Sequence, residues 1–484
     1  MPLKLSDIDN RRVGFFRFKE LSGRYLITGD AGQYCFLEPR QFDLFLAGKI
    51  KQAYPDKYSE LQDKGFIRDM LDFDGLAKKY ASKNAFLGNG PSLHIVVVTL
   101  RCDHKCIYCQ TSSKSLKARG LDMDISTAQK VVDMIFMSPS EGITIEFQGG
   151  EPLINLDAVK FIVQYAKKKN KTEKKELRFA LVSNLTFMTE DILKYLAEND
   201  ISVCTSLDGP ENVHNKQRIA GPGVNSYSNT VKWLKRLRQE IYKHSGYKVN
   251  ALTTITKHSL NYPKEIIDEF VKLGLESIHL RPVSLLGENR KKRQQINFSP
   301  EAFFNFYRKA LDYIIELNRE GKNFNERMAG IFLTKILTDA DPNYLDIRSP
   351  CGAGIGQLAY NFNGDVYTCD EARMLSMMGD ESFRLGNVVK NCYEEIIDNN
   401  IIKTLCSASC LDNLPGCSQC VYKPYCGVCP IYNYTEKQDI FIQPRNSLLC
   451  NIYTPILDYL FERLQDEHDD TKGIFDSWVR NGQE

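Results

Sequence analysis

The chain has 484 residues and a formal net charge of +2; 43% of its residues are hydrophobic and 26% are charged. This length allows two or three domains with a large buried core, and the composition is ordinary for a globular protein. The small net charge argues against a nucleic-acid or anionic-membrane partner. The longest apolar runs, such as IVVV at 95–98, are too short to span a bilayer. The N-terminus lacks the apolar core of a signal peptide, so we expect a cytoplasmic protein.

Residues 1–90 are predicted to form a small N-terminal unit. RYLITGD and QYCFLEP predict a β-hairpin, and the apolar spacing in RQFDLFLAGKI and YSELQDKGFI predicts helices. This order resembles a winged-helix-like module. The stretch YASKNAFLGNGPS at 80–92 is rich in Gly, Asn and Ser, which predicts a linker.

Residues 91–300 alternate between strand and helix patterns. Because each β-then-α unit must cross back over the sheet, such a series predicts parallel strands. Six units predict a partial (β/α)6 TIM-like barrel, whose active site should lie at the carboxyl ends of the strands. The expected strands cover 94–100, 143–149, 177–184, 201–209, 247–255 and 277–283.

The rest of the chain is predicted to contain a helical linker at 301–345 and a cysteine-rich domain at 346–484. The chain has 15 cysteines. In a reducing compartment such a number points to metal ligands or catalysis rather than to disulfides. Three cysteines lie at 102–109, nine lie between 351 and 429, and Cys450 follows them. This distribution predicts two separate metal-binding regions.

The first cysteine group follows the first predicted strand. Cys102, Cys106 and Cys109 are spaced C-x3-C-x2-C. A structural zinc site needs four ligands, and so does a closed [4Fe–4S] cluster. Three cysteines on a [4Fe–4S] cluster leave one iron open to a small molecule that chelates through amino and carboxylate groups. A zinc loop or a chance spacing is the alternative interpretation.

The C-x3-C-x2-C loop resembles the signature of the radical SAM enzymes. The resemblance implies that the open iron binds S-adenosylmethionine, whose reductive cleavage gives a 5′-deoxyadenosyl radical. Tyr108 occupies the place of the aromatic residue that lies beside the adenine in this family. Gly149, Gly150 and Glu151, in FQGGEP after the second strand, match the motif that receives the methionyl amino group. Glycines also allow the backbone to approach a ligand closely.

The same resemblance assigns cofactor contacts at the ends of the third and fourth strands. Ser183 and Asn184 close the third strand in VSN, and Ser206 begins SLDGP at the end of the fourth. By resemblance these side chains lie near the ribose and carboxylate of the cofactor. Arg218 matches an arginine that related maturases use on the cofactor, and a surface ion pair is the alternative for it.

The C-terminal cysteines resemble a SPASM domain, which carries two auxiliary iron–sulfur clusters. The chain has C-x2-C-x5-C-x2-C before a proline, whereas the family usually ends this motif as C-x3-C. The resemblance leaves the second cluster without an obvious fourth ligand, for which Cys410 is a spare candidate. Paired C-x2-C motifs are also typical of zinc knuckles. The ligands implied are Cys417, Cys420, Cys426 and Cys450 for one cluster, and Cys351, Cys369 and Cys429 for the other.

Asp370 directly follows Cys369. In the sulfatase maturases an aspartate at the matching place accepts a proton, so we expect Asp370 to be a general base. Aspartate is also common as a local cap or turn residue, which is the alternative.

The N-terminal stretch at 13–50 resembles the start of radical SAM maturase B of the His-Xaa-Ser repeat peptide systems. This implies a ribosomally made peptide or protein substrate with His-Xaa-Ser repeats, a reductant such as flavodoxin or ferredoxin, and a second maturase as partner. The N-terminal hairpin could bind the substrate's leader by strand addition, or it could be a structural cap. Two rival functions are an anaerobic sulfatase maturase that forms formylglycine and a non-enzymatic iron–sulfur or zinc scaffold.

Overall fold

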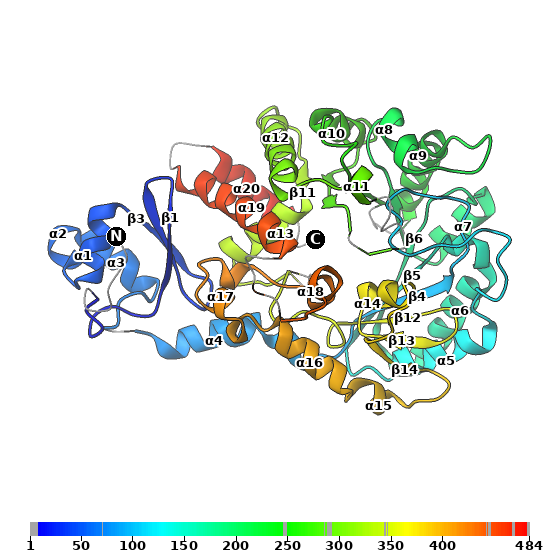
Figure 1. Cartoon of the computed structure of the whole chain (residues 1–484), viewed down its shortest axis with the longest axis horizontal. Coiled ribbons are helices and arrows are strands. Elements are labelled where there is room, and N and C mark those ends of the chain that lie inside the picture. The colour runs from blue at the N-terminus through cyan, green and yellow to red at the C-terminus, as the bar shows by residue number, and fades with distance from the viewer. Residues whose placement is uncertain are drawn as a thin grey trace.

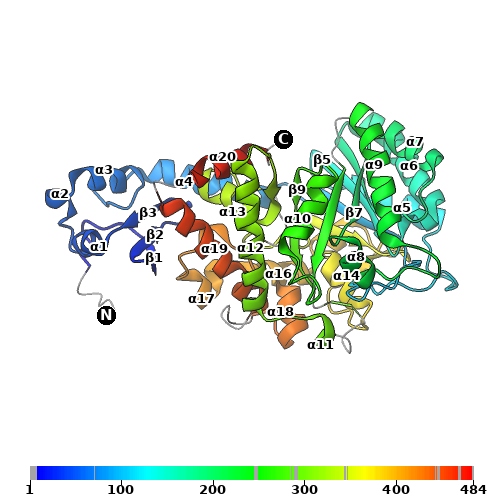
Figure 2. The ribbon, with the colours of Figure 1, turned by 90° about the horizontal axis from the view of Figure 1, so that it is seen from above.

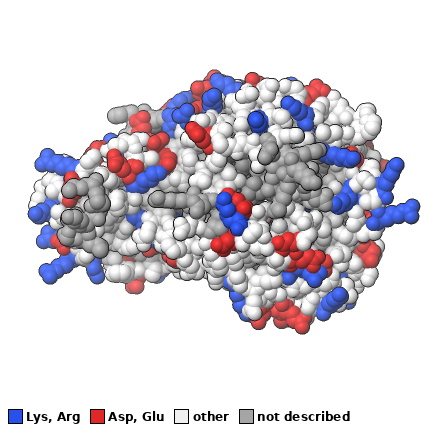
Figure 3. All heavy atoms as spheres, viewed as in Figure 1, with Lys and Arg blue, Asp and Glu red and all other residues white. Residues whose placement is uncertain are grey.

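The computed structural model shows an elongated α/β protein with the small N-terminal unit at one end and the barrel at the other (Figure 1). Among the described residues, no helix combines the length and apolar character needed to cross a membrane. On the face in Figure 3, acidic and basic side chains are interspersed, in agreement with the small net charge. The structure describes residues 8–481 except 70, 245–248, 285, 288–292, 343–344, 346, 442, 444–446 and 467–469.

The N-terminal unit is a three-stranded antiparallel sheet with short helices on one side. The predicted hairpin is present as β2 (Arg24–Thr28) and β3 (Tyr34–Leu37). The sequence analysis missed β1 (Arg17–Leu21), which pairs with β2 and makes the order β1-β2-β3. The side chains of Val13, Ile27, Phe45 and Leu61 belong to a separate small core. The helices are α1 (Pro39–Leu46), α2 (Ile50–Ala53) and α3 (Pro55–Asp63).

The predicted linker at 80–92 is wrong in its first half. Helix α4 (Phe73–Lys83) continues into this stretch, and a 3-10 turn follows at Ala85–Gly88. The carboxylate of Asp72 accepts a hydrogen bond from Gly75 N and caps the helix. The helix is nucleated at this cap, and Tyr80 to Lys83 extend it. The composition of 80–92 did not reveal that the helix continues into this stretch.

The six predicted barrel strands are confirmed as a parallel sheet in the order β10-β8-β7-β6-β5-β4. The sixth expected strand is divided into β9 (Ser277–Ile278) and β10, and β9 pairs with β11 (Asn325–Glu326) instead. The other strands are β4 (Leu93–Thr99), β5 (Gly142–Gly149), β6 (Glu176–Val182), β7 (Ile201–Ser206), β8 (Asn250–Ile255) and β10 (Leu280–Pro282). The helices between and after these strands are α5 (Ile125–Phe136), α6 (Leu156–Glu173), α7 (Glu190–Glu198), α8 (Glu211–Gln217), α9 (Ser226–His244), α10 (Pro263–Lys272) and α11 (Arg293–Ile296).

The C-terminal region extends this barrel sheet rather than standing apart from it. Strand β12 (Gln357–Tyr360) pairs with β4 in parallel, and β13 (Asp365–Tyr367) and β14 (Arg384–Asn387) continue the sheet to nine strands. One hydrophobic core therefore runs through the barrel and the C-terminal helices. The remaining helices are α12 (Pro300–Arg319), α13 (Arg327–Leu337), α14 (Asp370–Ser376), α15 (Tyr393–Ile397), α16 (Asn400–Ser409), α17 (Pro415–Ser418), α18 (Pro430–Lys437), α19 (Leu448–Gln465) and α20 (Thr471–Asn481).

The N-terminal sheet packs against the segment that contains three of the C-terminal cysteines. Thr28 Oγ1 donates to the carbonyl of Val421 at 2.7 Å, and Arg17 Nε donates to the carbonyl of Ser418 at 2.6 Å. From the other side, the Tyr425 hydroxyl donates to the carbonyl of Gly32 at 3.0 Å. Seen from above, α4 runs from the N-terminal unit toward the rest of the molecule (Figure 2). The sheet thus covers the loop from Cys417 to Cys426.

Candidate functional site

A cavity of about 610 Å³ lies inside the barrel and reaches the C-terminal region. The strands β5, β7 and β8 alternate between fully buried and half-buried residues. Most of the half-buried residues line the cavity, and those of β7, Ser202, Cys204 and Ser206, are small. Because successive side chains of a strand point to opposite faces, the large apolar residues pack under the helices. The small inward residues leave the interior hollow.

The three-cysteine loop lies at the carboxyl end of β4, as predicted, and all three thiols line the cavity. The loop is held by backbone bonds to the end of α8 and the segment after it: Ile107 N donates to Gln217 O at 2.9 Å and Lys105 N to Ile219 O at 2.7 Å. Burial raises the pKa of Cys106 to about 12, although the nearby Arg218 opposes the rise. At Cys109 the hydroxyls of Thr111 and Ser113, each 3.4 Å from Sγ, outweigh burial and lower the pKa.

Tyr108 and Arg218 are joined to a third buried residue, Asp208. The Tyr108 hydroxyl donates to Asp208 Oδ2 at 2.7 Å, and Arg218 Nη1 donates to the Tyr108 oxygen at 2.8 Å. Burial raises the pKa of Asp208 to about 6, against the opposing effects of Arg218 and Tyr108. Tyr108 and Arg218 line the cavity, and the buried Arg218 Nε has no hydrogen-bond partner among the described residues. That atom is a donor available to an anionic or polar ligand in the cavity.

Gly149 and Gly150 pass directly against the cysteine loop. A Cβ on Gly149, whose φ is +150°, would lie 2.1 Å from Thr99 O, and one on Gly150 would lie 2.2 Å from Arg101 O. Both contacts are to backbone atoms, which cannot move aside without moving the loop. The glycines are therefore required by the close approach of two backbone segments.

Glu151 does not line the cavity, which departs from the expected direct contact with the cofactor. It is fully buried, and its carboxylate accepts bonds from Leu153 N, Ser183 Oγ and Asn184 N at 3.1, 2.7 and 2.7 Å. Burial raises its pKa to about 7, although these donors favour the ionised form. The carboxylate ties the ends of β5 and β6 together. It thereby positions Ser183 and Asn184, which do line the cavity.

The C-terminal cysteines come together in the two sets that the motif implied. Burial raises the pKa of Cys426, and the thiols of Cys420, Cys450 and Cys417 add to the rise. In the other set, burial and then Glu371 raise the pKa of Cys369, and Cys429 and Cys351 add to it. The set of Cys351, Cys369 and Cys429 lines the same cavity as the first cysteine loop. The spare candidate Cys410 does not line this cavity.

Within the described ranges, one group of three side chains has its candidate metal-ligand atoms within 4.8 Å of one another: Cys102, Asp103 and His104. This group contains one of the three cysteines of the first loop.

Asp370 lines the cavity and lies at the first turn of α14. Its Oδ1 accepts a bond from Arg373 Nε at 2.7 Å, and the Arg373 side chain is fully buried. This ion pair fixes the orientation of the carboxylate toward the interior. The cap alternative is not what the structure shows, because Cys369, not Asp370, caps α14 by accepting from Ala372 N at 3.4 Å.

Several residues in or beside the cavity were missed by the sequence analysis. Asp208 bonds to the cavity-lining Tyr108; it lies in the SLDGP stretch that was already assigned to the end of the fourth strand, so its position was the available signal. Glu146 precedes Gly150 by four residues and points inward, with its carboxylate accepting from Gln148 Nε2 at 2.6 Å. Cys204 also lines the cavity. Strand alternation could have shown which of these residues point inward.

The comparisons with known proteins agree with this geometry. Residues 96–250 match the family model of the Radical SAM superfamily. A cysteine-type anaerobic sulfatase-maturating enzyme of Clostridium novyi (strain NT) is 23% identical over 342 residues, which cover 69% of this chain and 86% of the relative. The radical SAM cyclopropyl synthase TigE of Paramaledivibacter caminithermalis is 25% identical over 190 residues, 37% of this chain and 38% of the relative.

Solved structures show the same fold. Native anSMEcpe with bound AdoMet aligns with a TM-score of 0.64 and 20% identity, over 77% of this chain and 98% of that one. Streptococcus suis SuiB bound to S-adenosylmethionine aligns with a TM-score of 0.53 and 14% identity, over 89% and 98%. With its three-cysteine loop at the carboxyl end of a strand in a parallel partial barrel, the chain has the radical SAM fold. In sequence it is similar to the sulfatase-maturating enzymes and to TigE.

Radical SAM proteins bind a [4Fe–4S] cluster and S-adenosylmethionine, and the residues here fit both. Cys102, Cys106 and Cys109 supply three thiolates at one wall of the cavity. The unpartnered Arg218 Nε and the cavity-lining Ser183, Asn184 and Ser206 supply polar groups for the nucleoside and carboxylate. The roles of these individual residues stay a prediction that mutation can test.

Replacing Gly150 with Ala is expected to disrupt the cofactor site. The new Cβ would lie 2.2 Å from Arg101 O, and relieving such a clash typically costs about 1–3 kcal/mol. Gly150→Ala should therefore lower the melting temperature and weaken binding of S-adenosylmethionine by at least tenfold, measured by thermal denaturation and equilibrium dialysis. Gly330→Ala is the matched control, because a Cβ there meets nothing within 4 Å. Equal affinities for the two variants would contradict the packing argument.

Glu151 is expected to make stability depend on pH. Its folded pKa of about 7 lies above its usual 4.5. The stabilisation is therefore complete below pH 4.5 and is lost as pH rises through 7. Relative to Glu151→Gln, the free energy of unfolding of the wild type should fall by about 2 kcal/mol between pH 5 and pH 8. Urea unfolding at both pH values measures this, and parallel pH profiles for the two proteins would refute it.

Proposed function

We propose that this enzyme modifies a ribosomally made peptide or protein by abstracting hydrogen from one of its residues. The proposal rests on one observation: three groups of residues share one cavity. It is lined by the three-cysteine loop, by Asp370 and by the set of Cys351, Cys369 and Cys429. A substrate side chain in this cavity has access to the cofactor, to a carboxylate and to a second thiolate group at once.

Bound S-adenosylmethionine supplies the 5′-deoxyadenosyl radical, and the protein supplies binding, orientation and exclusion of water. Arg218 and the Tyr108–Asp208 pair fix one side of the site by hydrogen bonds. The buried wall of strands keeps water from the reacting atoms. Asp370, held by Arg373, is placed to accept a proton from the substrate.

The substrate class rests on relatives and on the resemblance of the N-terminal stretch. Structures similar to this chain include anSMEcpe with the Cp18Cys peptide and SuiB with the precursor peptide SuiA. A peptide that carries His-Xaa-Ser repeats is our proposed substrate. A sulfatase, oxidised to formylglycine, is a second candidate, because sulfatase-maturating enzymes cover 69% and 77% of this chain and because Asp370 lies in the cavity. Incubation with each substrate, scored by mass spectrometry, distinguishes them.

The proposal includes a cellular setting and partners. Free thiols for three clusters require a reducing compartment, so we place the enzyme in the cytoplasm. A flavodoxin or ferredoxin would supply the electron, and a second maturase would act on the same peptide. The two auxiliary clusters, held by Cys417, Cys420, Cys426 and Cys450 and by Cys351, Cys369 and Cys429, would take an electron from the substrate or bind it.

The N-terminal unit is proposed to bind the leader of the substrate. Its sheet has edge strands β1 and β3, and an extended peptide can add to such an edge through main-chain hydrogen bonds. Next to β1, Phe15 and Phe18 are 54% and 41% exposed, although Phe18 also packs near Tyr25 and Phe42. An exposed aromatic group beside a free edge offers both strand pairing and apolar contact.

The cysteine assignments predict a separation of cofactor cleavage from product formation. Cys102→Ala should abolish 5′-deoxyadenosine formation, because it removes one of three ligands. Cys420→Ala should preserve this cleavage but stop peptide modification. The assay is an anaerobic reaction with S-adenosylmethionine and dithionite, followed by mass spectrometry. Cys392→Ala is the control, since Cys392 is exposed and outside the three sets. Cleavage by the Cys102→Ala protein would show that the assignment is wrong.

The leader proposal predicts a local effect on affinity. Phe18→Glu should weaken binding of the full precursor peptide by about tenfold, because it loses roughly 1.4 kcal/mol of apolar contact at the β1 edge. Fluorescence anisotropy with labelled precursor measures this. Phe73→Glu, on α4 and 70% exposed, should leave affinity unchanged. If both variants bind like the wild type, the unit is a structural cap.

A further inference from the structure

Two buried histidines are joined by one serine hydroxyl. His104 and Ser226 are each 3% exposed, and His214 is fully buried. Ser226 Oγ lies 2.9 Å from His104 Nε2 and 3.0 Å from His214 Nε2. His104 belongs to the three-cysteine loop, Ser226 is the first residue of α9, and His214 lies on α8. We call these three residues the His–Ser–His bridge, since they link the loop to both helices.

The backbone fixes the direction of each hydrogen bond in the bridge. Asp208 N donates to His214 Nδ1 at 3.3 Å, so that nitrogen carries no proton. Burial lowers the pKa of His214 to about 2, and a neutral imidazole holds its one proton on the other nitrogen. His214 Nε2 therefore donates to Ser226. The Ser226 hydroxyl, which has one hydrogen, then donates to His104 Nε2, and this leaves the proton of His104 on Nδ1.

The bridge ends on a carboxylate of the same loop. His104 Nδ1 lies 3.0 Å from Asp103 Oδ1, and Asn184 Nδ2 donates to the same oxygen at 2.8 Å. The two nitrogens are 3.0 Å from each other, as expected for two donors that converge on one acceptor. From Asp208 N to Asp103 Oδ1, each donor of the bridge thus meets an acceptor. A buried polar network that is fully satisfied in this way is rigid.

The other end of the bridge returns to the same loop. Asp208, which donates to His214, also accepts the hydrogen bond of the Tyr108 hydroxyl at 2.7 Å. His104 and Tyr108 stand two residues before and two residues after Cys106. Both sides of this central cysteine are therefore held by one closed circuit of hydrogen bonds, which passes through α8 and the start of α9.

The circuit fixes the loop relative to the residues that are expected to hold the cofactor. Arg218 Nη1 donates to the Tyr108 oxygen at 2.8 Å, and Asn184 lines the cavity. A misplacement of about 1 Å can lower the rate of a reaction about a hundredfold. Neither His214 nor Ser226 lines the cavity, so any effect of these two residues on the reaction passes through their partners.

We propose that Ser226 and His214 are positioning residues, which hold the three-cysteine loop in register with Asp208 and Tyr108 and thereby set the rate of cofactor cleavage. This inference rests on the proposed cleavage of S-adenosylmethionine, and it holds whichever peptide is the substrate. Loss of either residue should disturb alignment more than binding, because the residues that line the cavity are unchanged.

The first test compares Ser226→Ala with Ser228→Ala in the reconstituted holoenzyme. Ser228 lies on the same helix and is exposed, which makes it the matched control. In Ser226→Ala the rate of 5′-deoxyadenosine formation per reduced cluster should fall roughly tenfold to hundredfold, with the KM for S-adenosylmethionine within about threefold of wild type. Electron paramagnetic resonance counts the reduced clusters, and the signal of the cofactor-bound cluster should broaden. A destabilised fold would reduce the number of clusters but not the rate per cluster.

A pair of changes at His214 tests the bridge independently. Glutamine can place an N–H near the position of the imidazole Nε2, whereas asparagine is too short to reach Ser226. His214→Asn should therefore reproduce the result of Ser226→Ala, and His214→Gln should stay closer to the wild type. Combining Ser226→Ala with His214→Asn should lower the rate no further, since both changes break the same bridge. If Ser226→Ala holds too few clusters to measure, the two His214 variants decide the matter.

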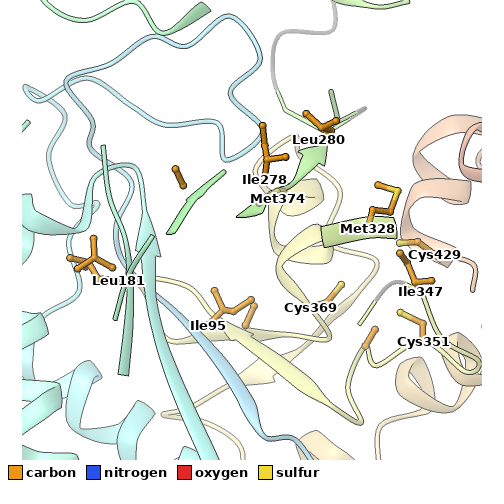
Figure 4. Close-up of a cluster of buried hydrophobic side chains, with 14 of the residues drawn as sticks. Ile95, Leu181, Ile278, Leu280, Met328, Ile347, Cys351, Cys369, Met374 and Cys429 are labelled. Atoms are coloured by element: carbon orange, nitrogen blue, oxygen red, sulfur yellow. The ribbon is translucent and has the colours of Figure 1, made fainter. Parts of the chain in front are cut away.

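The proposed auxiliary cluster of Cys351, Cys369 and Cys429 provides an internal reference. Figure 4 shows these three cysteines among the buried side chains of the main core, and the signal of their cluster should not change. A wild-type rate per cluster in both Ser226→Ala and His214→Asn would overturn the inference, as would additive losses in the double variant. A wild type that forms no 5′-deoxyadenosine would instead overturn the proposed cleavage.

Discussion

The parallel pairing of β12 with β4 is the constraint on which the site depends. Gln357 to Tyr360 lie beside Leu93 to Val96 in register, so the C-terminal region continues the barrel sheet. Strand β4 leads into the first cysteine loop, and β12 is flanked by Cys351 and Cys369. The pairing therefore fixes two thiol groups, far apart in the sequence, on one cavity. A flexible linker between two domains could not hold them in a fixed relation.

The hollow interior follows from which residues the strands turn inward. A closed eight-stranded barrel fills its centre with bulky branched side chains. Here the half-buried Ser202, Cys204 and Ser206 of β7 line the cavity, and its Ile201 and Val203 are buried in the core. The hydrophobic effect thus stabilises the outer layer, and the inner layer is left for ligands. Charged groups such as Glu146 can line this space because other polar groups and the ligand share it.

The sequence revealed features carried by residues that are close together in the chain. It missed features that depend on contacts between distant segments. The spacing of Cys102, Cys106 and Cys109 together with the following motif singled out the loop, and apolar patterning located the six strands. Strand β1 was missed because RFKEL lacks a clear alternation, and its pairing comes from tertiary contacts with β2. The motif assigned Glu151 to the cofactor. Only the fold shows that its carboxylate accepts hydrogen bonds from Ser183 and Asn184. Asp208 acquires its role from Tyr108, one hundred residues earlier.

If the N-terminal unit binds the leader as proposed, its position separates peptide recognition from the reaction. Its sheet is bonded to the loop from Cys417 to Cys426, whereas the cavity is lined mainly by the barrel strands and the loops at their ends. A substrate held at β1 must therefore extend across the C-terminal region before a residue can enter the cavity. Since an extended chain covers about 3.3 Å per residue, the distance between leader and modified residue is set by the protein. The same leader can then deliver different core sequences, as long as their spacing places a reactive residue at the cavity.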